Sequence, residues 1–138
     1  CDVYVDFDMR VRCVVPRLRM EIRSGEVSKG RVVRDPRIMT PAGRVVELLG
    51  AGPGVITVQL FVTEDGRLRF NEVNPRFGGG APLSIQAGAN FPKWILQELT
   101  GRRPQIDPQG FEDGLTMLRY DDEVWARDGQ LKGTKVEM

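Results

Sequence analysis

Between residues 70 and 80 the sequence reads FNEVNPRFGGG, and its polar side chains have a spacing that could bind a metal ion and a phosphate. Glu72 and Asn74 are two residues apart, so on a β-strand both point to the same face. A carboxylate and an amide oxygen suit Mg²⁺, which completes its shell with water and phosphate oxygens. Arg76 follows two residues later, and a guanidinium beside a metal would neutralise a phosphate chain.

Three glycines follow this polar stretch directly. Gly78, Gly79 and Gly80 allow backbone N–H groups to approach an anion closely, and the N-terminus of the helix expected after them would point toward it. Together with the polar side chains, they predict a phosphate site. The alternative is a solvated polar strand face followed by a flexible connection. Phe61 and Phe70 argue against it, because they are expected beside the polar patch on the same face and indicate that this face is covered.

A β-hairpin is predicted to position these side chains. Two β-branched and aromatic runs, VITVQLFV and LRFNEVN, are separated by TEDGR, and Asp65 with Gly66 is a strong signal for a two-residue turn. Counting back from that turn places Gln59 directly across from Glu72. Gln59 then shares a face with Glu72 and Asn74 as a third oxygen ligand. A four-residue loop keeps the same pairing, whereas a three-residue loop would shift it by one residue and send Gln59 to the opposite face.

The remaining pattern predicts an α+β fold in one domain, residues 1–138. It is a mostly antiparallel β-sheet with helices packed on one face. Alternating apolar residues indicate strands within residues 1–33, joined by the 54–74 hairpin and a late strand near 115–125. Helices are expected at 36–49, 82–89 and 92–100, the first with Asp35 as N-cap, Pro36 at its first position and Gly50 after its end. The ARDGQL stretch predicts another Asp-Gly turn.

Composition excludes several classes of function. With 20 basic and 19 acidic residues the net charge is +1, so no global field attracts nucleic acid or a membrane. The absence of histidine removes histidine-based triads and histidine-ligated zinc. Cys1 and Cys13 are too few for a disulfide framework, and no apolar run is long enough to span a bilayer, so a cytoplasmic protein is predicted.

The stretch from residue 58 to residue 101 resembles the C-terminal part of an ATP-grasp domain, of the carbamoyl-phosphate-synthase large-subunit-like kind. The likeness rests on an E-x-N-P-R core, here Glu72, Asn74, Pro75 and Arg76, followed by FGGGAPLS and AGANFP. Upstream, VVPRLRMEIRSGEVSKGRVVRDP is similar to the strand and loop before the nucleotide-side helix of that group. Downstream, FEDGLTMLRYDDEVW is similar to the group's ending, so the likeness covers residues 1 to about 126.

The resemblance implies residue roles and a reaction. Glu72 and Asn74 would hold Mg²⁺, with Mn²⁺ as the alternative metal, bridging the phosphates of ATP, and Gln59 would be the other metal-facing residue. Arg76 would contact the transferring γ-phosphoryl group and the acyl phosphate it becomes. In this family a carboxylate attacks ATP, and an amine, ammonia or a thiol then displaces the phosphate from the acyl phosphate.

The resemblance also implies which other residues lie close to the nucleotide. Gly78 and Gly79 would contact the phosphates, and Lys29 lies where the nucleotide-side loop of the family approaches the site. Four further arginines either contact substrate or are surface residues on strand edges: Arg17, Arg19, Arg31 and Arg34.

An ATP-grasp enzyme clamps ATP between two subdomains, and the resemblance covers one of them. The N-terminal clamping subdomain and a preceding Rossmann-like domain would lie upstream of residue 1. The chain alone is therefore expected to bind Mg-ATP weakly and to turn over nothing, unless a homo-oligomer or a companion subunit supplies the missing subdomain. The alternative function is a non-catalytic ATP-grasp-derived module for subunit association. A nucleic-acid binder is disfavoured by the near-zero net charge.

Overall fold

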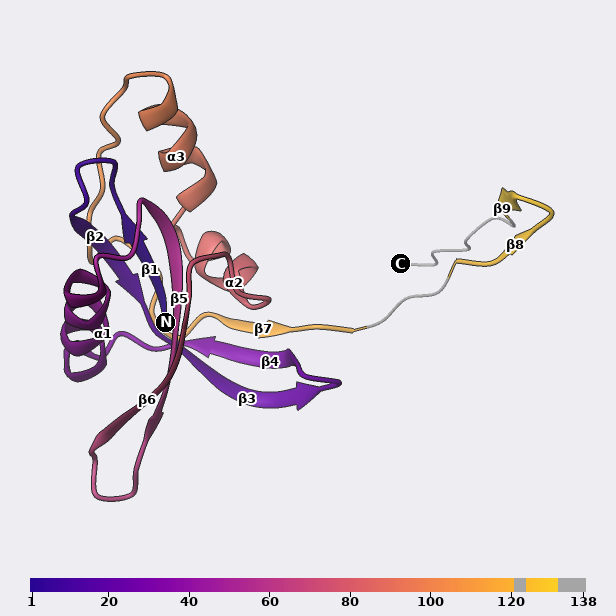
Figure 1. The fold of residues 1–138 in the computed structure, drawn as a ribbon. Coiled ribbons are helices and arrows are strands. Elements are labelled where there is room, and N and C mark those ends of the chain that lie inside the picture. The colour runs from indigo at the N-terminus through magenta and orange to yellow at the C-terminus, as the bar shows by residue number, and fades with distance from the viewer. Residues whose placement is uncertain (121–123, 132–138) are drawn as a thin grey trace.

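The computed structural model describes residues 1–120 and 124–131, and these form an α+β fold, as predicted (Figure 1). The elements in chain order are β1 (Asp2–Val5), β2 (Val11–Val15), β3 (Arg17–Arg23), β4 (Glu26–Val32), α1 (Pro36–Leu49), β5 (Gly54–Val62), β6 (Leu68–Asn74), α2 (Ala81–Gln86), α3 (Phe91–Leu99), β7 (Thr116–Leu118), β8 (Ala126–Arg127) and β9 (Gln130–Leu131).

The strands form two main antiparallel sheets where the sequence predicted one. The first has the order β2-β1-β5-β6 and the second the order β3-β4-β7, while β8 and β9 form a separate hairpin. The chain passes from the first sheet to the second at Pro16, which lies between β2 and β3. Proline has no N–H group for a ladder and a fixed φ, so it is suited to end one sheet and redirect the chain into the next.

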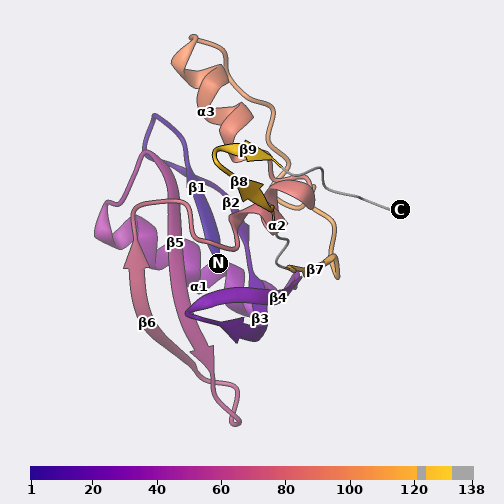
Figure 2. The ribbon, with the colours of Figure 1, turned by 90° about the vertical axis from the view of Figure 1, so that its right-hand side faces the viewer.

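Helices cover both faces of the four-stranded sheet, whereas the sequence predicted them on one (Figures 1 and 2). On one face α1 lies so close that a Cβ added to Gly43 would be 3.4 Å from the side chain of Val14. On the other face the Tyr4 ring lies 5.3 Å from the ring of Trp94 in α3, centroid to centroid. Val14 pairs with Val3, the neighbour of Tyr4, so the two contacts lie on opposite sides of β1.

Local sequence signals set the boundaries of the helices. In α1 the Asp35 carboxylate accepts a hydrogen bond from the Arg37 N–H at 2.9 Å, and Gly50 after the helix is left-handed with φ of 59°. The predicted range of 36–49 is therefore confirmed, together with both caps. In α3 the side chain of Asn90 accepts from the Lys93 N–H. The predicted 82–89 helix is shorter, since α2 has six residues and ends at Gln86.

The β5–β6 hairpin has a different turn from the predicted one. Thr63 N–H donates to the Arg67 carbonyl at 2.9 Å, and Gly66 N–H donates to the Thr63 carbonyl at 2.8 Å, so the loop contains three residues. Gly66 is left-handed, with φ of 78°, as in the hairpin where a type I turn is followed by a left-handed residue. The predicted two-residue turn at Asp65 and Gly66 is wrong.

A β-bulge in β6 restores the predicted pairing farther from the turn. Leu60 pairs with Phe70, but the next pair is Gln59 with Glu72, so Asn71 is skipped. The bulged residue in β6 offsets the additional residue in the loop, since each of them shifts the strand pairing by one residue. The predicted opposition of Gln59 and Glu72 is therefore confirmed, although the reasoning through the turn was not correct.

The far half of this hairpin projects away from the sheets (Figure 1). Phe61 and Phe70 are 64% and 40% exposed. Because Phe70 pairs with Leu60, it lies on the opposite face from Gln59. The prediction that these two aromatic residues flank a covered polar face is wrong.

The C-terminal strands are shorter than the predicted late strand. β7 pairs with β4, and residues 121–123, within the predicted range of 115–125, lie outside the described residues. The Asp-Gly turn is confirmed between β8 and β9, where Asp128 and Gly129 have φ of 50° and 76°. None of the helices in the described part of the chain is long and apolar enough to cross a membrane.

Candidate functional site

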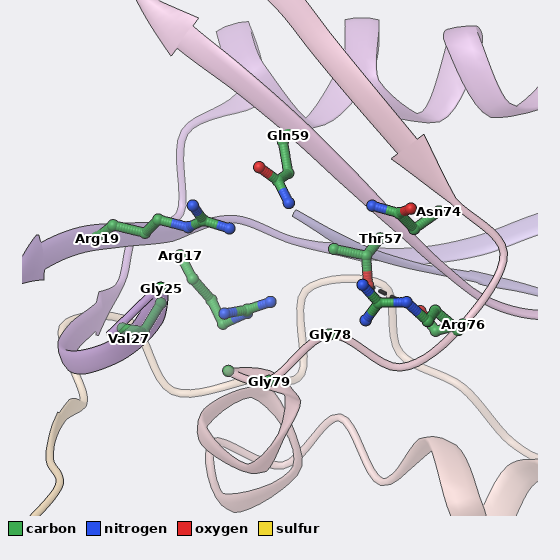
Figure 3. A pocket seen from close by; sticks show the side chains of 11 residues that line it. Arg17, Arg19, Gly25, Val27, Thr57, Gln59, Asn74, Arg76, Gly78 and Gly79 are labelled. Atoms are coloured by element: carbon green, nitrogen blue, oxygen red, sulfur yellow. Dashed lines mark hydrogen bonds between the residues drawn. The ribbon is translucent and has the colours of Figure 1, made fainter. Parts of the chain in front are cut away.

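A pocket of about 160 Å³ opens between the two main sheets, beside the glycine loop (Figure 3). One wall comes from β3, β4 and the turn between them, a second from the paired strands β5 and β6, and a third from the loop that follows β6. Its lining residues are Arg17, Arg19, Gly25, Val27, Thr57, Gln59, Asn74, Arg76, Gly78, Gly79 and Gly80.

Positive charge dominates this pocket. Its lining includes the three arginines Arg17, Arg19 and Arg76, and among the described residues that line it none is acidic. Figure 3 shows Arg19 and Arg76 on opposite sides of the opening with Arg17 between them. The chain as a whole is nearly neutral, so this is a local concentration of cationic side chains that suits an anionic ligand.

The predicted metal-binding residues meet where β5 and β6 pair. Gln59 lies opposite Glu72, and Asn74 Nδ2 donates to Glu72 Oε1 at 2.6 Å. That hydrogen bond occupies one atom of each side chain and leaves Asn74 Oδ1 and Glu72 Oε2 outside it. Gln59 and Asn74 line the pocket, whereas Glu72 is exposed beside it.

This donor set fits Mg²⁺ on chemical grounds. No group of three or more His, Cys, Asp or Glu side chains is placed to hold a metal within residues 1–120 and 124–131. A metal here would therefore rely on one carboxylate, from Glu72, and on the amide oxygens of Gln59 and Asn74. Mg²⁺ is commonly bound by one or two carboxylates while water and substrate phosphates complete its octahedron, so such a site binds metal weakly until the phosphates arrive.

Arg76 is placed by the turn that ends β6. The hydroxyl of Thr57, which pairs with Asn74 as predicted, donates to the Arg76 carbonyl at 2.8 Å. The Arg76 N–H donates to the Asn74 carbonyl, also at 2.8 Å. The backbone of this turn is thus held from both strands, while the Arg76 side chain is exposed and donates through Nη1 to the Phe77 carbonyl at 3.1 Å.

The glycine loop lies against side chains rather than in open solvent. A Cβ added to Gly80 would be 1.8 Å from Arg17 Nη1, and one added to Gly78 would be 3.0 Å from Thr57 Oγ1. At Gly80, therefore, glycine is required by close packing against a guanidinium. From the sequence, these glycines were predicted to let backbone N–H groups approach an anion. All three line the pocket.

Lys29, the other predicted nucleotide contact, does not line the pocket. It lies on β4, where its ammonium group is 3.7 Å from Glu21 Oε2 on β3. The structure thus brings together Gln59, Asn74, Arg76, Gly78 and Gly79 around one pocket, with Glu72 beside it and Lys29 outside.

Arg17 is one of the four arginines whose role the sequence left undecided. Its Nε and Nη2 donate to the two oxygens of Asp2, at 2.7 and 2.8 Å, and the Ser84 hydroxyl donates to Asp2 Oδ2 at 2.6 Å. The side chains of Arg17 and Asp2 are only 7% and 0% exposed. Asp2 lies on the same face of β1 as Tyr4, and the aromatic side chain of Tyr4 was the available sequence signal that this face is covered.

A second pocket, of about 200 Å³, includes Cys13, Trp94 and Asp107 in its lining. Burial, with a smaller contribution from the negative charge of Asp107, raises the pKa of the Cys13 thiol to about 12. The thiol therefore stays protonated at neutral pH and is a poor nucleophile and metal ligand. This pocket offers no chemistry comparable to that of the arginine-lined one.

The chain belongs to the family described as "ATP-grasp in the biosynthetic pathway with Ter operon", whose model matches residues 1–122. The comparison with curated proteins gives no match. The predicted ATP-grasp class is confirmed, while the carbamoyl-phosphate-synthase-like kind remains a resemblance. ATP-grasp membership indicates an ATP-dependent, ligase-type function, and domains of this class generally bind ATP and Mg²⁺ and use carboxylate substrates.

Proposed function

We propose that this chain is the metal- and phosphoryl-handling half of an ATP-dependent ligase that joins a carboxylate to an amine or a thiol through an acyl phosphate. The observation that carries this proposal is the cross-strand group of Gln59, Glu72 and Asn74 beside a pocket lined by three arginines. A metal ligand set and an anion pocket side by side are what a phosphoryl transfer between two anionic reactants requires.

The size of the pocket supports the proposal that this chain carries half of the active site. At about 160 Å³ it is well below the roughly 300–1,000 Å³ of pockets that enclose whole ligands. A phosphate or a carboxylate group fits such a volume, but a complete nucleotide does not. We infer that adenosine is held by a second, clamping subdomain, supplied by a preceding part of the same protein, by a second copy or by a companion subunit.

Within this half, the residues have distinct tasks. Glu72 Oε2, Asn74 Oδ1 and the amide oxygen of Gln59 would hold Mg²⁺, which when bound would neutralise the phosphate oxygens. Arg76 is the catalytic candidate, because its exposed guanidinium extends from a fixed turn at the pocket and can follow the γ-phosphoryl group as it moves to the carboxylate. Such catalysis consists mainly of positioning and charge neutralisation.

A paramagnetic titration tests the metal site directly. Mn²⁺ added with ATP should broaden the side-chain amide NMR signals of Gln59 and Asn74. The Glu72→Gln substitution keeps the shape and removes the charge, so it should abolish that broadening. The matched control is Glu64→Gln, which changes an exposed carboxylate at the tip of the same hairpin and should leave the broadening intact. Equal broadening in both variants would remove the metal site.

Calorimetry on the same chain tests the proposal that the site is half complete. Mg-ATP is expected to bind in the millimolar range, because a weak metal site and a small anion pocket hold only the phosphate chain. Micromolar binding, or ADP release by the isolated chain, would contradict the assignment of half a site.

A second candidate function, a non-catalytic module for subunit association, is favoured by one observation. Leu18, Met20 and Ile22 on β3 are 54%, 51% and 51% exposed and recur at every second residue, so an apolar row lies open to solvent. Sedimentation velocity of the wild type and of Met20→Glu distinguishes the two functions. Self-association that the substitution abolishes, combined with no Mn²⁺-dependent broadening, would favour the module.

A further inference from the structure

The Arg17 guanidinium is fixed in an orientation that leaves one nitrogen for the pocket. Nε and Nη2 form a bidentate pair with the Asp2 carboxylate, whose Oδ2 also accepts from Ser84. These three side chains come from β3, β1 and α2, so three elements hold the orientation. Figure 3 shows the guanidinium inside the pocket, between Gly79 and Gln59. A planar guanidinium with two of its nitrogens paired can rotate little, so its third nitrogen, Nη1, is held at a fixed position.

Burial of this group indicates that the arrangement serves a ligand. An arginine without a ligand to bind would extend its guanidinium into water. The Arg17 side chain is instead only 7% exposed, and it lines a pocket. A buried ion pair is a weak source of stability, because desolvation of both charges cancels much of their attraction. The pair with Asp2 offsets the charge of Arg17 without removing the donors on Nη1, while Arg19 and Arg76 add positive charge at the same opening.

Gly80 shows how tightly the position of Nη1 is specified. A Cβ on residue 80 would be 1.8 Å from Nη1 and 2.8 Å from Cζ of Arg17, so any other side chain would displace the guanidinium. Gly80 has φ of −93° and ψ of 1°, the conformation of the third residue of a type I turn, which is compatible with most residues that have a side chain. Glycine is therefore required at this position for the space it leaves to Arg17, and not for its backbone conformation.

We infer that Arg17 is a substrate-binding residue whose Nη1 donates to an oxyanion, a carboxylate or phosphate oxygen, held in the pocket between Arg19 and Arg76. Asp2 and Ser84 are its positioning residues. The inference rests on the proposed function in that it specifies the anion subsite of the same active site, but it needs no metal. The subsite takes a group that is small and negatively charged, because the pocket is about 160 Å³ and its charged lining residues are arginines.

Arginine side-chain NMR of the 138-residue chain, without metal or nucleotide, tests this inference. Inorganic phosphate and acetate are titrated in separate experiments, and the ¹⁵N signals of Arg17 are followed. A saturable shift of these signals is expected with at least one of the two anions. A shift with phosphate alone assigns the subsite to the phosphate chain, and a shift with acetate alone assigns it to the carboxylate substrate. Absence of a saturable shift with both anions overturns the inference.

Two variants make the test specific. Gly80→Ala should weaken anion binding by at least about tenfold, the loss expected when one charge-assisted hydrogen bond is removed. Arg44→Lys, which changes an exposed arginine paired with Glu47 on α1, should leave the affinity unchanged. Equal affinity in Gly80→Ala and wild type would overturn the inference. In Glu72→Gln the anion shift should persist, so loss of the metal site and loss of the Arg17 subsite are observed separately.

Discussion

The Asp2→Asn substitution tests the central contact of this structure. It keeps the shape of the side chain and removes the negative charge that faces the Arg17 guanidinium at 2.7 and 2.8 Å. One of the two oxygens becomes an NH₂ group, which cannot accept from Arg17. The positive charge of Arg17 then remains buried without a counter-charge, and Ser84 loses a charged acceptor.

The expected cost follows from the burial of the pair. Removing one partner of a buried ion pair costs about 3–5 kcal/mol, because the remaining charge is left uncompensated. Both side chains are almost fully buried, at 7% and 0% exposure, so this range applies. The remaining Asn oxygen still accepts one hydrogen bond, which favours the lower end, about 3 kcal/mol. For a chain of this size that corresponds to a decrease in Tm of roughly 6–12 °C.

Urea denaturation followed by circular dichroism measures this loss in free energy of unfolding. The matched control is Asp8→Asn, since Asp8 pairs with Arg10 at 2.6 Å but both side chains are more than half exposed. That variant should lose less than about 1 kcal/mol. Adding Arg17→Met to Asp2→Asn should cost less than the two separate losses combined, because the buried charge is then gone as well. A loss for Asp2→Asn no greater than that for Asp8→Asn would refute the reasoning.

Three further predictions concern the rest of the fold. Burial opposes ionisation of Asp6, but hydrogen bonds from two arginines outweigh it and hold its pKa below the usual range, so its stabilisation is present above the unfolded pKa of about 3.9 and is lost as pH falls through the folded pKa. Asp6→Asn should therefore reduce the loss of free energy of unfolding between pH 7 and pH 3, and an unchanged difference would contradict this assignment. The Cys13 thiol, whose pKa burial raises to about 12, should react with a thiol reagent at pH 8 only after unfolding, and rapid reaction of the native protein would be inconsistent with its environment. Deleting Asn71 should remove the β-bulge and retain the pairing of Gln59 with Glu72, which a cross-strand nuclear Overhauser effect between those residues would report; its loss would show that the bulge itself sets the register.

The hairpin illustrates how far sequence reasoning extends. The paired polar residues were predicted correctly, but only because two deviations cancel: the loop has one more residue than predicted, and β6 contains a bulge at Asn71. An Asp-Gly pair occurs both in two-residue turns and in three-residue loops with a left-handed glycine, so the turn type could not be read from it. Nothing in the run LRFNEVN distinguishes Asn71 as a bulged residue.

Helix boundaries were more predictable than sheet membership. The ends of α1 depend on Asp35 and Gly50, which act on their own neighbours in the chain. Division of the strands into two sheets depends instead on which strands pair: the chain leaves the first sheet at Pro16, and β3 pairs with β4 in the second. The sequence pattern shows that a residue is in a strand, but the partners of that strand are a property of the whole fold.

The sequence by itself determined the local chemistry of this protein: an E-x-N-P-R stretch that places Glu72 and Asn74 on one strand face, and the glycines after it. Tertiary structure alone decided that Arg17 belongs to the same site, held by Asp2 and Ser84, which lie 15 residues before and 67 residues after it. The physical reason is that strand alternation fixes the side to which a residue points, but not what packs against that side. Asp2 needed a buried partner only once α2 and β3 had covered its face of the sheet.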